Sequence, residues 1–400
     1  MATQSHKEEL HISKFEAPQS MKTIAFAFTG IGLIGFLVGI IKNPEAMWPN
    51  YLTAFFFVSC LALGGMFFTV IQHVAKAGWS AGIRRLSEAM TSFFPVMVVG
   101  SLVLIAGIKY LYSWADAAVI ADSPMVAAKT AYLNVPFLVL RMLIFGIGAL
   151  LFARKIIGNS LKQDSDGAEV YTNQNVGFSI GYILFFAIFF SLFSMDLLMS
   201  LLPTWYSTIF GIYCFSGMFQ SGLAFLILIM LYMRNTGKIK GYFGMDHVHD
   251  VGKFLKGFTV FWAYIAFSQF MLIWYANIPE ETEFYLMRSH GGWMTVSMAL
   301  LIFKFIVPFL ALLPRDAKRN TVHLSLVCVL ILFMQYLDIY WLVLPNFEGI
   351  RAVTGFYEIT LLLGFLGLFL LTLIKFFSKN NIVAIKDPRM HESLSHHVTY

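Results

Sequence analysis

Ten apolar stretches long enough to cross a lipid bilayer constrain this chain more than any other feature. Each holds about 20 mostly apolar residues, the number that an α-helix needs to span the hydrocarbon core. Their apolar content is continuous and does not alternate with period two, which favours helices over the strands of a membrane barrel. The sequence therefore predicts an all-α integral membrane protein of about ten transmembrane helices, located approximately at 23–41, 51–72, 93–112, 136–153, 176–201, 206–233, 257–276, 291–313, 323–344 and 355–377.

The composition excludes an ordinary soluble protein. Only 12% of the residues are charged and 58% are hydrophobic, whereas soluble domains are about a quarter charged. We expect a cytoplasmic tail at 1–22, a transmembrane domain at 23–377 and a second cytoplasmic tail at 378–400. The polar first twenty residues lack the apolar core of a signal peptide, so the first helix is expected to be an uncleaved anchor. No segment is long enough for a separate soluble domain.

The distribution of Lys and Arg predicts the orientation in the membrane. Twenty-one of the 28 fall in the N-terminal tail, the even-numbered loops and the C-terminal end, whereas only four fall in the odd-numbered loops. Cytoplasmic loops carry the excess of positive charge, so both termini are expected in the cytoplasm. The sequence pI near 9.0 follows from this topology. It indicates a lipid bilayer as partner and does not indicate nucleic acid.

A short internal repeat predicts how the helices are grouped. DLLMSLLP at 196–203 ends the fifth helix and DIYWLVLP at 338–345 ends the ninth, and both helices run outward. An offset of four helices preserves orientation, so helices 2–5 and 6–9 are expected to form two parallel four-helix bundles, flanked by helices 1 and 10. Segments 79–92 and 116–133 are expected to hold short interfacial helices.

Ionisable residues at membrane depth are the candidate functional residues, since burial of each costs roughly 2.5–3.5 kcal/mol at the bilayer centre. They suggest a proton path or a quinol head-group pocket near the extracytoplasmic face. In the alternative reading Asp196 pairs with Arg141 or Lys109 to hold helices together, and both basic side chains reach toward the interface. The candidates are Asp196, Asp338, Glu358, Lys109 and Arg141 in the outer third, with Lys304, Gln220 and Gln269 deeper in the membrane.

Histidine and cysteine placement argues against a resident metal or haem. No pair of histidines lies in the middle of a predicted helix to ligate a b-type haem, and Cys60, Cys214 and Cys328 stand alone in apolar runs. His247 and His249 could hold a metal together with nearby aspartates, but a solvated loop is the favoured reading. We therefore expect no metal and no ligated cofactor.

Two segments resemble a known family. The segment DVGKFLKGFTVFWAYIAFSQ at 250–269, followed by IWYANIPEE at 273–281, closely resembles the second NrfD-like (ActF-type) membrane subunits of alternative complex III. SEAM at 87–90 after Arg84 and Arg85, and the stretch 196–203, look similar to the same subunits. This resemblance implies a polysulfide-reductase-like fold in the bacterial inner membrane.

The resemblance also implies a function and partners. Alternative complex III is a respiratory quinol:cytochrome c oxidoreductase, so the chain would be a cofactor-free subunit that contributes a quinol (or menaquinol) site, a proton half-channel, or both. Its partners would be pentahaem and monohaem cytochromes c, an iron–sulfur subunit and another NrfD-like subunit. Two alternatives remain open at this point: a stand-alone secondary transporter and a purely structural membrane anchor.

Overall fold

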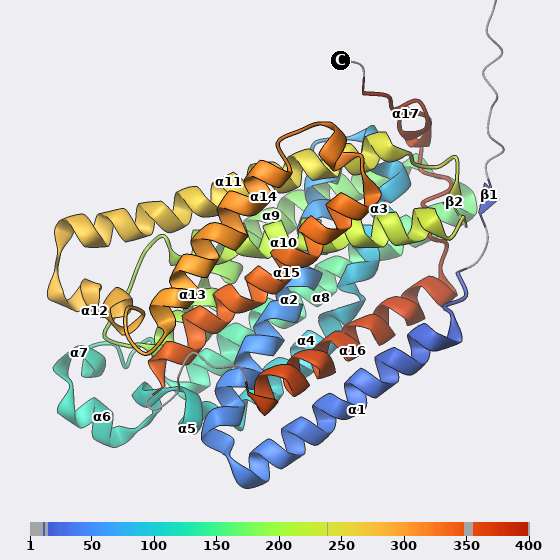
Figure 1. Cartoon of the computed structure of the whole chain (residues 1–400). Helices are drawn as coiled ribbons and strands as arrows, with labels where there is room; N and C mark the ends of the chain where they lie inside the picture. The colour runs from blue at the N-terminus through green and yellow to red at the C-terminus, as the bar shows by residue number, and fades with distance from the viewer. Residues whose placement is uncertain (1–10, 13–14, 238, 348–354, 399–400) are drawn as a thin grey trace, which may run out of the picture.

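The computed structural model describes residues 11–12, 15–237, 239–347 and 355–398. Within these residues, ten helical spans are long and apolar enough to cross a membrane, and they lie side by side in one bundle (Figure 1). The predicted multi-pass, all-α fold is therefore confirmed. The spans are α1 (Gln19–Lys42), α2 (Pro44–Val74), η1–α3–η2–α4 (Gly78–Ile105), α8 (Val135–Asp166), α9–η4 (Glu169–Leu201), α10 (Phe210–Asn235), α11 (Met245–Ala276), α13–η5–α14 (Trp293–Ala311), α15–η7 (Thr321–Asn346) and α16 (Phe356–Lys379).

Short elements mark the two ends of the bundle. One end, here the loop end, carries α5 (Ile108–Leu111), η3 (Ser113–Ala115), α6 (Ala117–Asp122), α7 (Pro124–Ala127) and α12 (Pro279–Met287). The other end, here the tail end, carries the paired two-residue strands β1 (His11–Ile12) and β2 (Ile239–Lys240), η6 (Asp316–Lys318) and α17 (Met390–Leu394). Figure 1 shows α6, α7 and α12 opposite β1, β2 and α17. The even number of spans returns the chain to the end where it starts.

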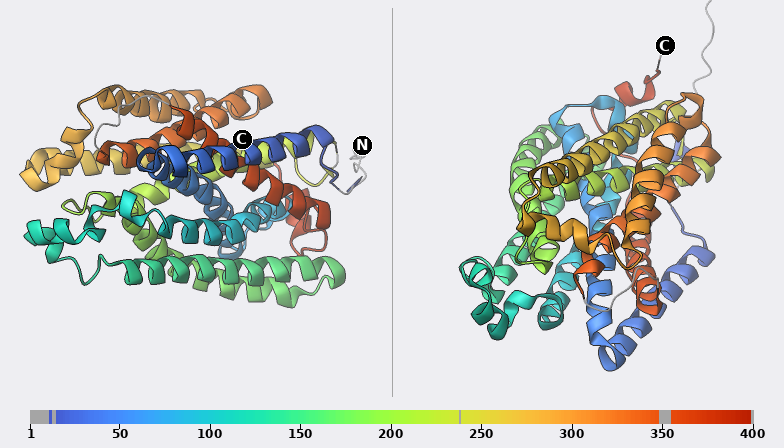
Figure 2. Two further views of the ribbon diagram at one scale, coloured as in Figure 1. Left: turned by 90° about the horizontal axis from the view of Figure 1, so that it is seen from below. Right: turned by 60° about the vertical axis from the view of Figure 1, so that its left-hand side comes forward.

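The helix contacts form two closed rings of four spans. In the first ring α2 packs against α3, α4 packs against α8, α8 against α9, and α9 against α2. In the second ring α10 packs against α11, α11 against η5 and α14, η5 against α15, and α15 against α10. The pair α1 and α16 lies outside both rings and leans on α2 (Figure 2). Whether the rings are an internal repeat stays a prediction, which the contacts support.

Glycines allow the closest helix approaches. A Cβ atom on Gly64 of α2 would lie 2.7 Å from the Cα atom of Gly222 on α10, and one on Gly32 of α1 would clash with the Cα atom of Gly364 on α16. Lipid chains offer no hydrophobic driving force between helices, so membrane helices associate through close packing of small residues. These two crossings join the first ring to the second, and α1 to α16.

The third span differs from its predicted position at 93–112. It begins at Gly78 and consists of η1 (Gly78–Ser80), α3 (Ala81–Met90), η2 (Thr91–Phe93) and α4 (Phe94–Ile105). All ten residues of α3 are buried, so the prediction of an interfacial helix at 79–92 is wrong. The charges of this segment pair with one another inside the protein, which removes the need to face water. The short helices expected within 116–133 are present as α6 and α7.

Two other helices extend well beyond their apolar stretches. The helix predicted at 136–153 continues to Asp166, and the helix predicted from 257 begins at Met245. Consequently His247 and His249 lie buried in the first two turns of α11, and their predicted place in a solvated loop is wrong. Hydropathy misses such turns because their polar side chains are buried against other polar groups. Among the charges used for orientation, Lys7, Lys14, Lys238 and Arg351 lie outside the described residues.

Candidate functional site

Lys304 lies in a stretch of unusual helix. Residues Leu300–Ile306 of the eighth span form the π-helix η5, and Lys304 is the charged residue within it. Its side chain is 0% exposed. Short π-helical turns inside α-helices occur frequently at functional sites, because the wider turn directs a side chain that a regular helix would place elsewhere. The deep lysine predicted from the sequence is thus buried inside the protein and not at the lipid surface.

An ion pair neutralises this lysine. The Nζ atom of Lys304 donates to Oδ2 of Asp338 on α15 at 2.5 Å and to Oε1 of Gln335 at 2.7 Å. The second carboxylate oxygen of Asp338, Oδ1, accepts a hydrogen bond from the Tyr213 hydroxyl of α10. The ammonium also lies 4.2 Å from the ring centre of Trp262 on α11, where a cation–π interaction adds roughly 1–2 kcal/mol.

The pair has further polar neighbours in the protein interior. Cys60 of α2 and Cys214 of α10 are buried and lie within electrostatic reach of both Lys304 and Asp338. The indole Nε1 of Trp262 is buried without a hydrogen-bond partner among the described residues. Buried polar atoms in proteins are normally satisfied by protein groups or ordered water. The site therefore combines an acid, a base, a phenol and an amide in one apolar enclosure.

A second ion pair lies in the first ring. Arg141 of α8 forms a bidentate contact with Asp196 of α9. Its Nε atom donates to Oδ2 at 2.7 Å and its Nη2 atom donates to Oδ1 at 2.9 Å. The Tyr132 hydroxyl donates to the same Oδ1 at 2.9 Å. The guanidinium is stacked 3.9 Å from the ring centre of Tyr132 and 4.2 Å from that of Phe137. This is the pairing that the structural alternative anticipated for Asp196 and Arg141, and Arg141 is buried.

The two pairs have the same construction. Asp196 and Asp338 each take a basic partner from the preceding span, Arg141 and Lys304 respectively, and each accepts a hydrogen bond from a tyrosine hydroxyl. The two aspartates are also the residues that align in the eight-residue repeat. The single outer polar layer expected from the sequence is thus two separate charge clusters, one in each ring.

The remaining candidates do not join these clusters. Glu358 is the third residue of α16, and its Oε2 atom accepts from the Gly355 amide at 3.0 Å, as a helix-capping residue does. Lys109 is exposed in α5 near the ring of Tyr110, in agreement with a side chain that reaches the interface. Gln220 donates to Thr259 at 3.0 Å. Gln269 is buried, and its Oε1 atom has no hydrogen-bond partner among the described residues.

Sequence reasoning missed several residues of the clusters. Gln335 was detectable, because it lies three positions before Asp338 and therefore on the same helix face. Tyr132, Tyr213 and Trp262 carried no such signal, since aromatic residues are abundant throughout the chain. Their roles depend on the tertiary packing of separate helices.

A buried arginine closes the loop end of the second ring. Arg288 donates to the backbone oxygens of Phe284, Trp341 and Leu342 at 2.7–3.0 Å. Its guanidinium carbon lies 3.5 Å from the ring centre of Phe284. Desolvation on burial lowers the pKa of Arg288 to about 9. Because it occupies the carbonyls at the end of α15, its main role is to cap that helix.

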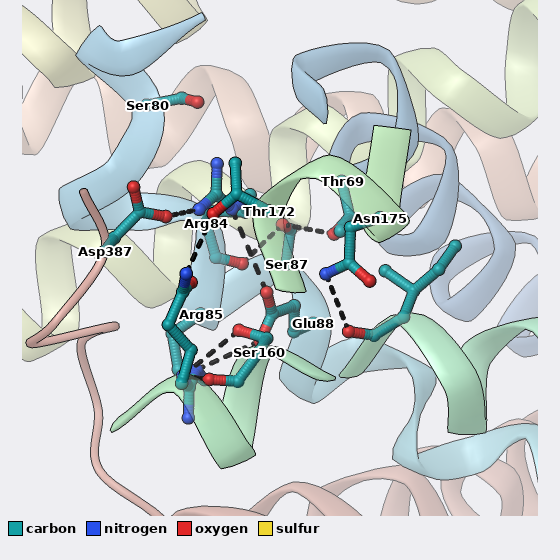
Figure 3. A network of polar contacts seen from close by, with 12 residues as sticks. Thr69, Ser80, Arg84, Arg85, Ser87, Glu88, Ser160, Thr172, Asn175 and Asp387 are labelled. Atoms are coloured by element: carbon teal, nitrogen blue, oxygen red, sulfur yellow. Dashed lines mark hydrogen bonds and ion pairs between the residues drawn. The ribbon is translucent and has the colours of Figure 1, made fainter. Parts of the chain in front are cut away.

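The tail end carries a third charged network, shown in Figure 3. Arg85 contacts Glu88 at 3.0 Å and Asp164 of α8 at 3.1 Å, and Ser160 donates to Glu88 at 3.0 Å. Arg84 binds Asp387, which precedes α17. This network ties α3, α8 and the C-terminal segment together.

The described residues contain no group of three or more His, Cys, Asp or Glu side chains placed to hold a metal ion. His247 contacts the Ser393 hydroxyl at 3.0 Å, and His396 contacts Asp250 at 2.7 Å. These histidines therefore anchor the C-terminal segment to α11. Comparison with protein-family models and with curated proteins finds no match to this chain.

Proposed function

We propose that this protein is a cofactor-free membrane subunit of a respiratory quinol:cytochrome c oxidoreductase, and that the Lys304–Asp338 pair is a proton-transfer site within it. The observation that carries the proton role is a fully buried ammonium, 2.5 Å from a carboxylate, held in a π-helical segment in the middle of a membrane span. Transfer of a proton from the ammonium to the carboxylate of such a pair leaves its net charge unchanged.

The energetics favour function over structural support. A buried ion pair contributes little to stability, because the desolvation of two charges offsets most of their attraction, and well-packed apolar replacements are often neutral or stabilising. The Tyr213 hydroxyl and the Gln335 amide give the pair hydrogen-bond partners that can adjust when one proton moves. Ionisable residues inside membrane spans commonly mark proton or ion pathways.

The wider assignment is supported by the sequence resemblance. The helix motif at 250–281 supports membership in an alternative complex III, with haem and iron–sulfur centres carried by partner subunits. The excess of Lys and Arg in the even-numbered loops supports a cytoplasmic tail end and an extracytoplasmic loop end, in a bacterial inner membrane. In the proposed reaction, quinol supplies the electrons and the protons.

The proposal is tested by removing both charges together. In the complex purified with mild detergent and reconstituted into vesicles, Lys304→Met/Asp338→Asn should keep the subunit composition, because no unpaired charge is left behind. Protons released on the loop-end side of the membrane, per electron transferred, should fall at least several-fold. Lys109→Met, which removes an exposed lysine at the loop end, is the matched control and should behave as wild type.

Three results would contradict the proposal. Wild-type proton release in the double variant would show that the pair is structural. Purification of the chain without haem proteins would remove it from a respiratory complex. Solute uptake by the chain alone in vesicles would favour the transporter alternative, for which the irregular η5 segment gives some support because transporters bind substrates at interrupted helices.

A further inference from the structure

A surface pocket at the loop end lies directly against the second ion pair. It has a volume of about 370 Å³, and its walls include Lys129, Tyr132, Met195, Ser200 and Trp205. Water occupies about 30 Å³ per molecule in the liquid, so a pocket of this size can hold several water molecules. The pocket lies at the loop end, and the distribution of Lys and Arg assigns that end to the exterior of the cell.

Tyr132 bridges this pocket and the buried carboxylate. The tyrosine is 37% exposed, whereas Asp196 is 1% exposed. The Tyr132 hydroxyl nevertheless donates to Oδ1 of Asp196 at 2.9 Å. The Ser200 hydroxyl, which also lines the pocket, donates to the backbone oxygen of Asp196 at 2.6 Å. The Tyr132 side chain thus lines the pocket, while its hydroxyl group binds the Asp196 carboxylate.

The helices that carry the two ion-pair clusters contact each other where α9 meets α10. Tyr213, which binds Asp338, is followed on α10 by Cys214, whose thiol hydrogen-bonds with Ser194 of α9. Ser194 lies two residues before Asp196. The deep pair and the outer pair therefore belong to separate clusters whose helices, α10 and α9, pack against each other.

We infer that the pocket is the outward mouth of the proton path, with the Tyr132 hydroxyl as the group through which Asp196 exchanges protons with external water. A proton reaching Asp196 binds a carboxylate oxygen. The Tyr132 hydroxyl turns from Oδ1 of Asp196 toward water in the pocket, its oxygen accepts the carboxyl proton, and its own proton passes to that water. One proton enters and one leaves, and no electron moves. This inference rests on the proposed proton role of the Lys304–Asp338 pair.

A mechanistic consequence concerns Lys129 at the rim. Its Nζ atom donates to the backbone oxygen of Pro203 at 2.6 Å and lies 5.5 Å from the ring centre of Tyr206. Burial lowers the pKa of Lys129 below its ordinary value. An ammonium at this position attracts anionic reagents to the mouth, which the test below uses.

The test introduces a cysteine into the pocket wall. Met195→Cys should react with a membrane-impermeant, anionic methanethiosulfonate added from outside. Met125→Cys on α7 is exposed, does not line the pocket and serves as control. Wild type should not react, because Cys60, Cys214 and Cys328 are buried. Modification of Met195→Cys should lower proton release several-fold, as should Tyr132→Phe, whereas modified Met125→Cys should match wild type.

The outcomes separate this inference from the proposed function. If Met195→Cys does not react with the reagent added from outside, the pocket is not the outward mouth of the proton path. This conclusion holds whatever proton release is measured. A second outcome is normal proton release in Tyr132→Phe and in modified Met195→Cys, with reduced proton release in Lys304→Met/Asp338→Asn. It would contradict the assignment of the pocket as the mouth and leave the proposed function supported. Normal release in all of them would overturn both.

Discussion

Asp196 of α9 and Asp338 of α15 are each held by a basic side chain from the preceding span and by a tyrosine hydroxyl. The two clusters differ in their base. Arg141 holds its carboxylate through two hydrogen bonds, whereas the ammonium of Lys304 holds the Asp338 carboxylate through one. The deeper pair is therefore the better candidate for proton exchange within the protein. The outer pair is the candidate for proton exchange with water, through the Tyr132 hydroxyl.

The stability of the Lys304–Asp338 pair should be non-additive. Lys304→Met alone leaves the Asp338 carboxylate buried without a counter-charge and is expected to lower the free energy of unfolding by about 3–5 kcal/mol. Lys304→Met/Asp338→Asn should lose much less. Thermal unfolding of the solubilised complex followed by size-exclusion fluorescence measures both. Equal losses in the single and double variants would contradict a coupled ion pair.

The crossing of α2 and α10 should not tolerate a single added methyl group. In Gly222→Ala the new Cβ would lie 2.7 Å from the Cα atom of Gly64, so the helices must separate. The expected loss is about 1–3 kcal/mol, as in other overpacked cores. Gly158→Ala on α8 is the control, because nothing lies within 4 Å of its added Cβ. Equal unfolding temperatures for the two variants would contradict the close crossing.

The C-terminal segment should come loose when its buried anchor is removed. Asp387→Ala removes the carboxylate that binds Arg84. The Arg84 guanidinium then keeps Glu88 as its acidic partner. Limited proteolysis of detergent-solubilised protein should then cleave the segment 380–398 several times faster than in wild type. His391→Ala on the exposed side of α17 should cleave at the wild-type rate, and faster cleavage there would mean that the segment is held loosely throughout.

The pKa of Lys129 should be lower in the folded protein than in the unfolded chain. Burial lowers its pKa in the folded protein, whereas the unfolded chain restores the ordinary value. Between the two pKa values the unfolded state binds more protons, so the contribution of Lys129 to stability rises with pH in that window. Reductive ¹³C-methylation and NMR titration measure the folded and denatured values, and Lys129→Arg assigns the signal. A folded pKa at or above the denatured value would contradict this environment.

Much of the fold follows from the sequence, and the limits have a physical origin. Lipid requires long apolar helices with satisfied backbones, so ten spans can be counted from hydropathy alone. The extensions of α8 to Asp166 and of α11 back to Met245 could not be predicted. The polar residues of these extensions pack against the protein because other elements supply partners, as Arg85 of α3 does for Asp164 of α8.

The candidate site shows the same division. Lys304 and Asp338 are visible in the sequence because a charge in an apolar run is conspicuous. Their pairing is not visible, since it depends on η5 turning the lysine toward α15. Glu358 looks like Asp338 in sequence but serves a helix end.

Infrared difference spectroscopy of the working complex tests the central claim, that the buried pair changes its protonation during quinol oxidation. Wild type should show a carboxylic acid band that appears during turnover, shifts in ²H₂O and is absent in Asp338→Asn. Identical difference spectra for wild type and Asp338→Asn would show that the Asp338 carboxylate keeps one protonation state, and the proton-transfer role of the pair would be contradicted.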